Sequence, residues 1–179
     1  MESKVINYAS YEALAITTKC YSDKVALPYV VLGLCGELGE LFEKIQKKDV
    51  DEHLVALEFQ DVMWYLAAIR IEFNLESIVD WPALTGKEVG PFDLPAAVGK
   101  IAEQVKKYLR DDWKEDESIS ISEERKSKIQ EAWNEIMQLM VDFNAQAFDL
   151  TMNEQGQQNI EKLADRAKRN QIHGQGDER

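Results

Sequence analysis

Apolar residues recur along this chain at the spacing of amphipathic helices, whereas the alternation typical of strands is almost absent. The clearest case is a seam along one helix face, formed by Val31, Leu34, Leu38, Leu41 and Ile45. Read together with boundary residues, this spacing predicts helices over residues 11–19, 28–48, 51–73, 96–110, 123–152 and 157–170. The pattern therefore predicts an all-α protein folded as a helical bundle.

Residues that start and interrupt helices divide the chain into two parts. Pro28 lies near the start of the second expected helix, and Asp51 is the expected N-cap of the third. Between residues 80 and 95 the chain collects three prolines and two glycines, which indicates a linker. The expected organisation is a single all-α domain of residues 1–179, made of a first half (1–79), the linker (80–95) and a second half (96–179).

The two halves share a faint internal repeat. LFEKIQK at residues 41–47 resembles IAEQVKK at residues 101–107, and each segment precedes a loop and a long apolar-rich helix. Two such helix pairs would make the chain a pseudo-dimer. The alternative is that any two amphipathic helices look alike, and the sequence leaves both interpretations open.

The chain is acidic, with 33 Asp and Glu against 21 Lys and Arg in 179 residues and a formal net charge of −12. A general nucleic-acid-binding protein needs a basic surface to neutralise phosphates, so we expect no direct binding to nucleic acid. A nucleotide enzyme stays possible because a divalent metal ion supplies positive charge.

Other features predict a soluble protein of the cytoplasm. Two cysteines are too few for a disulfide framework and fit a reducing compartment. The longest apolar run, residues 25–35, is shorter than the roughly 20 residues that span a bilayer. The first residues lack the basic-then-apolar order of a signal peptide. We therefore expect no association with a membrane.

Four carboxylates are expected on the second and third helices. Glu37 and Glu40 are three residues apart and share one helix face, and Glu58 and Asp61 repeat this spacing. Tyr65 follows one turn after Asp61 on the same face. Because apolar residues surround both pairs, the carboxylates are expected to be partly buried, which is costly without a partner. Two antiparallel helices would bring the four groups together around a cation.

Magnesium fits this donor set because Mg²⁺ prefers oxygen ligands and commonly bridges carboxylates to phosphates, with Mn²⁺ as a possible substitute. The cluster lacks histidine, which argues against a zinc site or a Glu-x-x-His di-iron site. The alternative is that these acids line an exposed helix face without any metal. Gly33, Gly36 and Gly39 add a further signal, since a helix with three glycines implies close approach by a neighbouring helix, our expectation, or by a ligand.

The residues resemble a known family. LGLCGELGE at residues 32–40 and EFQDVMWYL at residues 58–66 are similar to the MazG-like all-α nucleoside triphosphate pyrophosphohydrolases, whose pattern is Glu-Glu-x-x-Glu, a spacer and Glu-x-x-Asp. Residues 11–18 also fit this family, and the tail from Asn159 to Arg179 is similar to the C-terminus of phage-type members. Together these segments cover about half of the chain.

The resemblance implies Mg²⁺-dependent hydrolysis of a nucleoside triphosphate between the α and β phosphates, giving a monophosphate and pyrophosphate. By match, the metal ligands would be Glu37, Glu40, Glu58 and Asp61, with Glu37 or Glu40 also acting as the general base in catalysis. Tyr65 would contact the sugar. The residues expected near the phosphates are Asn159, Lys162, Arg166 and Arg169, with Lys44 and Lys47 as weaker candidates.

The chain departs from the family pattern in two ways. Gly36 stands where the family has its first glutamate, and about 80 residues separate the Glu-x-x-Asp helix from the tail. If the second half is a degenerate copy, its positions equivalent to the four carboxylates are Ala97, Lys100, Ala132 and Glu135. One chain would then carry one working site, formed by the first half and completed by the tail of the second half.

The expected partner is therefore a nucleoside triphosphate substrate, in a pseudo-dimeric monomer or a homodimer, in a bacterial cell or a phage-infected host. The alternative function is an acidic helical protein that binds a nucleotide or a protein partner without turnover.

Overall fold

The computed structural model describes residues 6–114 and 121–169, and every regular element in these ranges is helical. The α-helices are α1 (Tyr8–Ala15), α2 (Ala26–Ile45), α3 (Glu52–Glu72), α4 (Asp93–Asp111), α5 (Glu123–Ala147) and α6 (Met152–Lys168). Two short 3₁₀-helices, η1 (Ile16–Thr18) and η2 (Asp23–Val25), connect α1 to α2. The predicted all-α fold class is confirmed.

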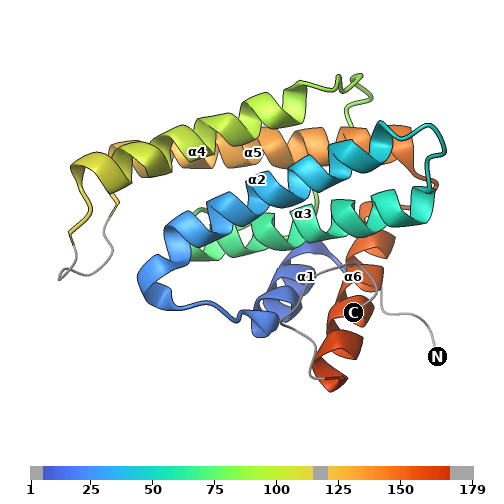
Figure 1. Cartoon of the computed structure of the whole chain (residues 1–179), viewed down its shortest axis with the longest axis horizontal. Helices are drawn as coiled ribbons and strands as arrows, with labels where there is room; N and C mark the ends of the chain where they lie inside the picture. Colours follow the sequence, from blue (N-terminus) through green and yellow to red (C-terminus); the bar gives the residue numbers. More distant parts are fainter. Residues whose placement is uncertain (1–5, 115–120, 170–179) are drawn as a thin grey trace.

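Two helical hairpins form the body of the molecule. The antiparallel pair α2–α3 packs beside the antiparallel pair α4–α5, with α2 next to α4 (Figure 1). Helices α1 and α6 lie side by side against α3, on the side away from α2 and α4. The first and the last described helices are therefore neighbours, so α6 from the second half of the chain covers a helix of the first half.

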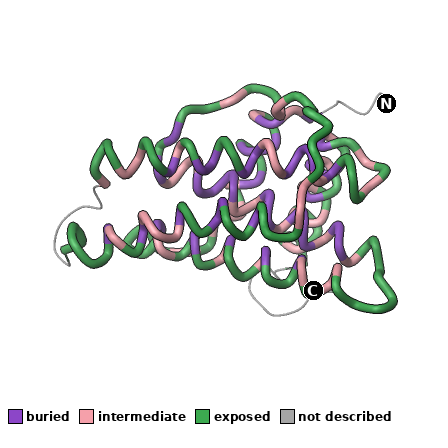
Figure 2. Tube along the Cα trace, turned by 90° about the horizontal axis from the view of Figure 1, so that it is seen from above, coloured by how far each residue is buried: buried purple, intermediate pink, exposed green. Residues whose placement is uncertain are grey.

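The core lies between the two hairpins and under α1. Figure 2 shows buried positions on the inward faces of the helices and exposed positions on their outer faces. The largest fully buried side chains come from both halves of the chain, and they include Tyr8, Leu41, Phe59, Ile101 and Trp133. The Trp133 indole nitrogen donates to the Leu66 carbonyl at 2.9 Å, which ties α5 to α3 inside this core.

Side-chain caps set several helix starts. The Asp51 carboxylate accepts hydrogen bonds from the backbone nitrogens of His53 and Leu54, which confirms the predicted N-cap of α3. Asn7 caps α1 through the backbone nitrogen of Ser10, so this helix begins at Tyr8 rather than at residue 11.

The prediction of one helix over residues 123–152 is wrong. Helix α5 ends at Ala147 because Phe148 is extended, and the Asn144 side chain donates to the Leu150 carbonyl at 2.6 Å across the turn. Helix α6 then begins at Met152 rather than at residue 157. A capping box between Thr151 and Glu154 satisfies the first backbone N–H groups of α6 and fixes this start.

The predicted linker has no regular structure before α4 begins at Asp93, but it is held firmly on α5. The Asp142 carboxylate accepts from the Thr85 backbone nitrogen at 2.8 Å, the Thr85 hydroxyl at 2.7 Å and the Gly86 backbone nitrogen at 3.1 Å. Gln138 and Gln146, one turn to either side, hydrogen-bond to backbone groups of Ala83, Lys87 and Val89. The linker therefore packs as an ordered strap along the second helix pair.

Within the described residues, the segment Asp23–Ile45 is long and apolar enough to cross a membrane, judged by length and composition alone. About 39% of its most apolar stretch is buried inside the protein. Core helices of soluble proteins pass the same test, so this finding is weak evidence for a membrane span.

Candidate functional site

The α2–α3 hairpin brings predicted carboxylates together across the two helices. One carboxylate oxygen from each of Glu37, Glu40 and Glu58 lies within 4.8 Å of the others. Glu58 is almost fully buried, Glu37 is half-buried and Glu40 is exposed, so this carboxylate trio opens to solvent on the Glu40 side. Asp61, the fourth predicted ligand, lies one turn after Glu58 on α3 and is not part of the trio.

Two lysines pair with the carboxylates of α3. Lys44, one turn after Glu40 on α2, forms an ion pair with Glu58. The Lys162 ammonium, which comes from α6, donates to Asp61 Oδ1 at 2.7 Å and to the Leu57 carbonyl at 3.2 Å. Burial lowers the pKa of Lys162, although Asp61 acts in the opposite direction. The second half of the chain thus contributes a charged group directly to the site.

Glu37 lies among three other carboxylates. Burial raises the pKa of this carboxyl to about 8, and the charges of Asp61, Glu58 and Glu40 act in the same direction. A carboxyl among carboxylates resists ionisation because each added charge repels the others. A cation between these groups would remove the repulsion, so the arrangement favours a divalent ion.

Tyr65 lies directly on the backbone of α2. A Cβ atom built on Gly33 would overlap the Tyr65 ring, so glycine at this position lets the ring reach α2 one turn before Glu37. The packing role expected for the glycines is thereby confirmed for Gly33. No described residue lies within 4 Å of a Cβ built on Gly36 or Gly39, so packing within the described ranges does not explain those two glycines.

An aromatic cluster continues from Tyr65 away from the carboxylates. Tyr21 stacks on Tyr29 with ring centroids 4.6 Å apart, and Tyr29 and Trp64 both contact Tyr65. Burial and the neighbouring Tyr29 raise the pKa of Tyr65 well above its ordinary value, so its hydroxyl stays protonated. Tyr29 is 39% exposed and gives this cluster a face toward solvent. Tyr8 and Tyr11, also available for stacking by sequence, are fully buried.

Of the residues predicted near the phosphates, some lie at the site and one is buried in the interior. Lys162 contacts Asp61, as described above, and Arg166 follows one turn later on α6, close enough to lower the pKa of Lys162 further. Asn159 is fully buried, and its Oδ1 accepts from the Tyr11 hydroxyl at 2.8 Å. The Asn159 side-chain nitrogen has no hydrogen-bond partner within the described part of the chain.

Arg169 and Lys47 lie just beyond the ends of α6 and α2. Arg169, at the end of α6, pairs with Asp165 at 2.7 Å. Lys47 follows the end of α2 and is exposed. The rest of the family-like tail, residues 170–179, lies outside the described residues.

In the described part of the second half, the positions that the predicted repeat aligns with the four carboxylates hold no such cluster. Ala97 and Ala132 are buried between α4 and α5. Lys100 and Glu135 form an ion pair of 2.5 Å across the same helices, with both side chains about half exposed. Among the residues that the structure describes, the carboxylate trio of the first half is the one group of carboxylate, histidine and cysteine side chains close enough together to hold a metal ion.

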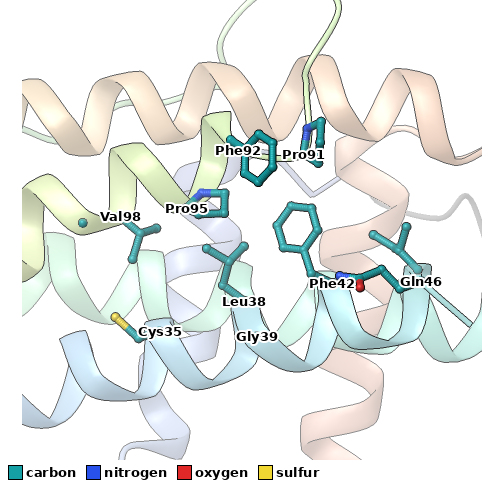
Figure 3. Close-up of a pocket in the computed structure, with 11 residues that line it drawn as sticks. Cys35, Leu38, Gly39, Phe42, Gln46, Pro91, Phe92, Pro95 and Val98 are labelled. Atoms are coloured by element: carbon teal, nitrogen blue, oxygen red, sulfur yellow. The ribbon is translucent and has the colours of Figure 1, made fainter.

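Sequence reasoning missed an apolar cavity of about 790 Å³ between α2 and the start of α4 (Figure 3). Leu38 and Phe42 on α2 face Pro91, Phe92 and Pro95 at the start of α4, around this open groove. Phe92 is 81% exposed, which is unusual for so large an apolar side chain. The groove could not be read from the sequence because its two walls come from segments about fifty residues apart.

Comparisons with known proteins add no relative. The chain matches no protein-family model, and neither curated proteins nor solved structures gave a significant match. The resemblance to the MazG-like family therefore stays a prediction that rests on the motifs of residues 32–40 and 58–66.

Proposed function

We propose that this protein hydrolyses a nucleoside triphosphate to the monophosphate and pyrophosphate in a reaction that depends on Mg²⁺. The observation that carries the proposal is the carboxylate trio of Glu37, Glu40 and Glu58, whose oxygens converge within 4.8 Å between two otherwise apolar helices. The family-like motifs point to the same chemistry, since the motif of residues 32–40 contains Glu37 and Glu40 and the motif of residues 58–66 contains Glu58.

The donor set fits a hard divalent ion. Carboxylate oxygens are the ligands that Mg²⁺ and Mn²⁺ prefer, and no imidazole or thiolate belongs to the carboxylate trio. The raised pKa of Glu37 supports the same conclusion, because burial and the neighbouring carboxylates disfavour its charged form, and a bound cation would favour it. Glu37, Glu40 and Glu58 would therefore hold the ion.

The protein's own groups have distinct tasks in this scheme. When bound, the ion would neutralise the triphosphate and supply a water of lowered pKa for attack on the α-phosphorus. Glu37 or Glu40 accepts the proton of the attacking water. The flat ring of Tyr65, held on α2 by the space at Gly33, offers a surface for the sugar. Lys162 and Arg166 on α6 attract the phosphates, for which ammonium and guanidinium groups are natural partners.

The test is pyrophosphate release from each of the common NTPs and dNTPs, measured with Mg²⁺, with Mn²⁺ and with EDTA. We expect release from a subset of the nucleotides, with none in EDTA and none from the Glu37→Gln and Glu40→Gln variants. Glu43→Gln, an exposed position one turn after Glu40, is the matched control and should retain full activity. Release of orthophosphate instead of pyrophosphate, or equal release in EDTA, would contradict the proposal.

The second candidate function is binding without turnover. It is favoured by Gly36, which stands where the family pattern has a glutamate, and by Lys44 and Lys162, which already pair with two of the four carboxylates. Calorimetry with non-hydrolysable α,β-methylene nucleotides distinguishes the two functions. Binding of such an analogue together with no pyrophosphate release from its natural counterpart would support the binding protein and reject the enzyme.

A further inference from the structure

The outer side of α2 is uncharged although it faces solvent. The chain has no charged residue from Val25 to Gly36, in a protein whose residues are 30% charged. Only 39% of the most apolar stretch of this segment is buried inside the protein. Leu32, within the uncharged run, is 72% exposed, and Val25 at its start is 47% exposed. A helix surface of this kind indicates a place that another molecule covers.

The apolar groove of Figure 3 extends this surface to α4. Its cavity of about 790 Å³ lies along the C-terminal half of α2, where Cys35 and Phe42 line it. Phe92, on the opposite wall, is 81% exposed. The outer side of α2 and the start of α4 thus form one apolar surface, which we call the α2 face. It includes Val25, Leu32, Cys35, Phe42, Phe92 and Pro95.

The charges at the two ends of the α2 face are opposite. Lys24 is exposed just before α2 begins, and Glu43 is exposed near its end. When two copies of α2 pack antiparallel about a two-fold axis, Lys24 of each copy comes opposite Glu43 of the other. In the same register, the exposed Leu32 of one copy meets Cys35 at the groove of the other. The α2 face is therefore complementary to itself, which the interface of a symmetric dimer requires.

A membrane surface fits the α2 face less well than a second copy does. The chain has a formal net charge of −12, and the exposed carboxylates of Glu40 and Glu43 follow the uncharged run on α2. Anionic lipid headgroups would repel these groups, and helices that lie on membranes usually carry lysine and arginine beside their apolar side. A second copy instead sets Lys24 against Glu43, so the charges favour a dimer.

We propose that this protein forms a homodimer in which the α2 faces of two copies pack antiparallel, with Lys24 of each copy against Glu43 of the other. Leu32 and Phe92 are exposed in the single chain because the second copy covers them. The carboxylate trio is not part of this interface, so the dimer goes beyond the proposed function and can be tested independently of it.

The test is the mass of the full-length protein in solution, measured by sedimentation equilibrium over a wide range of concentrations. We expect the wild-type protein to have twice the mass of one chain. Leu32→Glu places a charge inside the interface and should raise the Kd of the dimer at least about 100-fold. Leu84→Glu is the matched control, because Leu84 is 58% exposed on the strap rather than on the α2 face, and this variant should stay dimeric.

Charge reversal and cross-linking test the antiparallel register. Lys24→Glu should weaken the dimer about tenfold, because each copy then sets a glutamate against Glu43 of the other. Lys24→Glu combined with Glu43→Lys should restore the wild-type Kd. Mild oxidation of Leu32→Cys should join two chains through Cys35, and the same variant with Cys35→Ser should not cross-link. This cross-link also tests the interface if Leu32→Glu fails to fold, which circular dichroism would show.

A wild-type protein that stays monomeric at every concentration would overturn the dimer. A monomer that sediments with vesicles of phosphatidylcholine and phosphatidylserine would do the same in favour of a membrane surface. A dimer that withstands Leu32→Glu would place the interface away from the α2 face. Failure of Glu43→Lys to rescue Lys24→Glu, together with no cross-link through Cys35, would overturn the antiparallel pairing.

Discussion

The two helix pairs of this protein share one plan. In the first pair, the segment that precedes α2 is fastened to α3, where the Trp64 indole nitrogen donates to the Ala15 carbonyl and the Thr18 hydroxyl. In the second pair, the segment that precedes α4 is fastened to α5 through Asp142 and its neighbours. In each pair, therefore, a connecting segment leads into the first helix, and the antiparallel second helix holds that segment in place through side-chain hydrogen bonds.

What differs is the chemistry between the helices. The first pair encloses three converging carboxylates, whereas the equivalent positions of the second pair hold buried Ala97 and Ala132 and the exposed Lys100–Glu135 ion pair. At these positions the second pair packs with alanine in place of an acid, so a helix pair of this kind does not require carboxylates there. Acids retained where alanine fits are a sign of function, because repulsion between them costs stability. That the chain is a pseudo-dimer of two related helix pairs stays a prediction.

We expect the largest difference in activity between substitutions of Asp61 and of its counterpart Glu135. The two positions are comparable because each carboxylate pairs with a lysine of another helix. Asp61→Asn should reduce the kcat of pyrophosphate release at least about 100-fold, equivalent to about 2.7 kcal/mol. The substitution removes a carboxylate that the family resemblance assigns to the metal and that holds Lys162, but leaves a side chain of the same shape. Steady-state kinetics with thermal unfolding on the same samples measures both effects, and we expect the fold to persist.

Glu135→Gln is the matched control for that variant. Its kcat should change less than about twofold, because the Lys100–Glu135 pair lies half exposed on the second hairpin. An equal loss of activity in both variants would mean that the second pair carries part of the site, and the contrast between the two halves would be incorrect. Unfolding of Asp61→Asn with activity lost only for that reason would make the acids structural.

The strap on α5 gives the next largest effect, this time on stability. Asp142→Ala should lower the free energy of unfolding by about 2 kcal/mol, because it removes a buried carboxylate that accepts three hydrogen bonds from Thr85 and Gly86. Gln146→Ala, at an exposed position of the same stripe, should cost less than about 1 kcal/mol. Urea unfolding measures both. Equal costs would show that the strap contributes little through Asp142.

The pH dependence of the strap follows from the same carboxylate. Burial acts to raise the pKa of Asp142, but the hydrogen bonds from Thr85, Gln138 and Gly86 outweigh it, so the pKa lies below its ordinary value. A lowered pKa in the folded state means that the stabilisation is present above the ordinary pKa of aspartate, about 3.9. It is lost as pH falls through the lowered value. Asp142→Asn should therefore flatten the acid side of the stability profile.

The sequence predicted local features better than long-range ones. The Asp51 cap and the pairing of acids on α2 and α3 depend on spacings of three or four residues, which a chain shows directly. The break between α5 and α6 was missed because apolar periodicity continues through Phe148 and Leu150. The capping-box pattern from Thr151 to Glu154 was the signal that could have revealed it.

Contacts between distant segments could not be predicted in this way. The Lys162–Asp61 pair joins residues 101 positions apart, and the sequence placed Lys162 near the phosphates without indicating a carboxylate partner. Asn159 was expected in the same place and is instead buried against Tyr11. Helical spacing shows that these residues share one face of α6, but only the packing of α6 against α1 and α3 decides which of them reach the site.

Alanine substitutions of two glycines of α2 should have smaller effects on stability, and these effects should be opposite in sign. Gly33→Ala should lower the free energy of unfolding by about 1–2 kcal/mol and also reduce activity, because the new methyl group displaces the Tyr65 ring. Gly36→Ala, which meets open space, should raise stability by about 0.5–1 kcal/mol through the helix propensity of alanine. Chemical denaturation and KM together measure the effect. A neutral Gly33→Ala would show that the Tyr65 ring moves freely and does not depend on this glycine.

The smallest effect is expected for the Lys100–Glu135 ion pair. Its two residues occupy the positions that the predicted repeat aligns with Glu40 and Asp61. Lys100→Met should change the free energy of unfolding by less than about 0.5 kcal/mol, because both side chains are about half exposed and solvent screens their attraction. Urea unfolding at low and high salt measures it, and the wild-type protein should show a similarly small salt dependence at this site. A loss above about 1 kcal/mol would mean that the second pair needs a charge contact between α4 and α5. In that case the carboxylates of α2 and α3 would have a structural counterpart, and their retention in the first pair would no longer argue for a catalytic role.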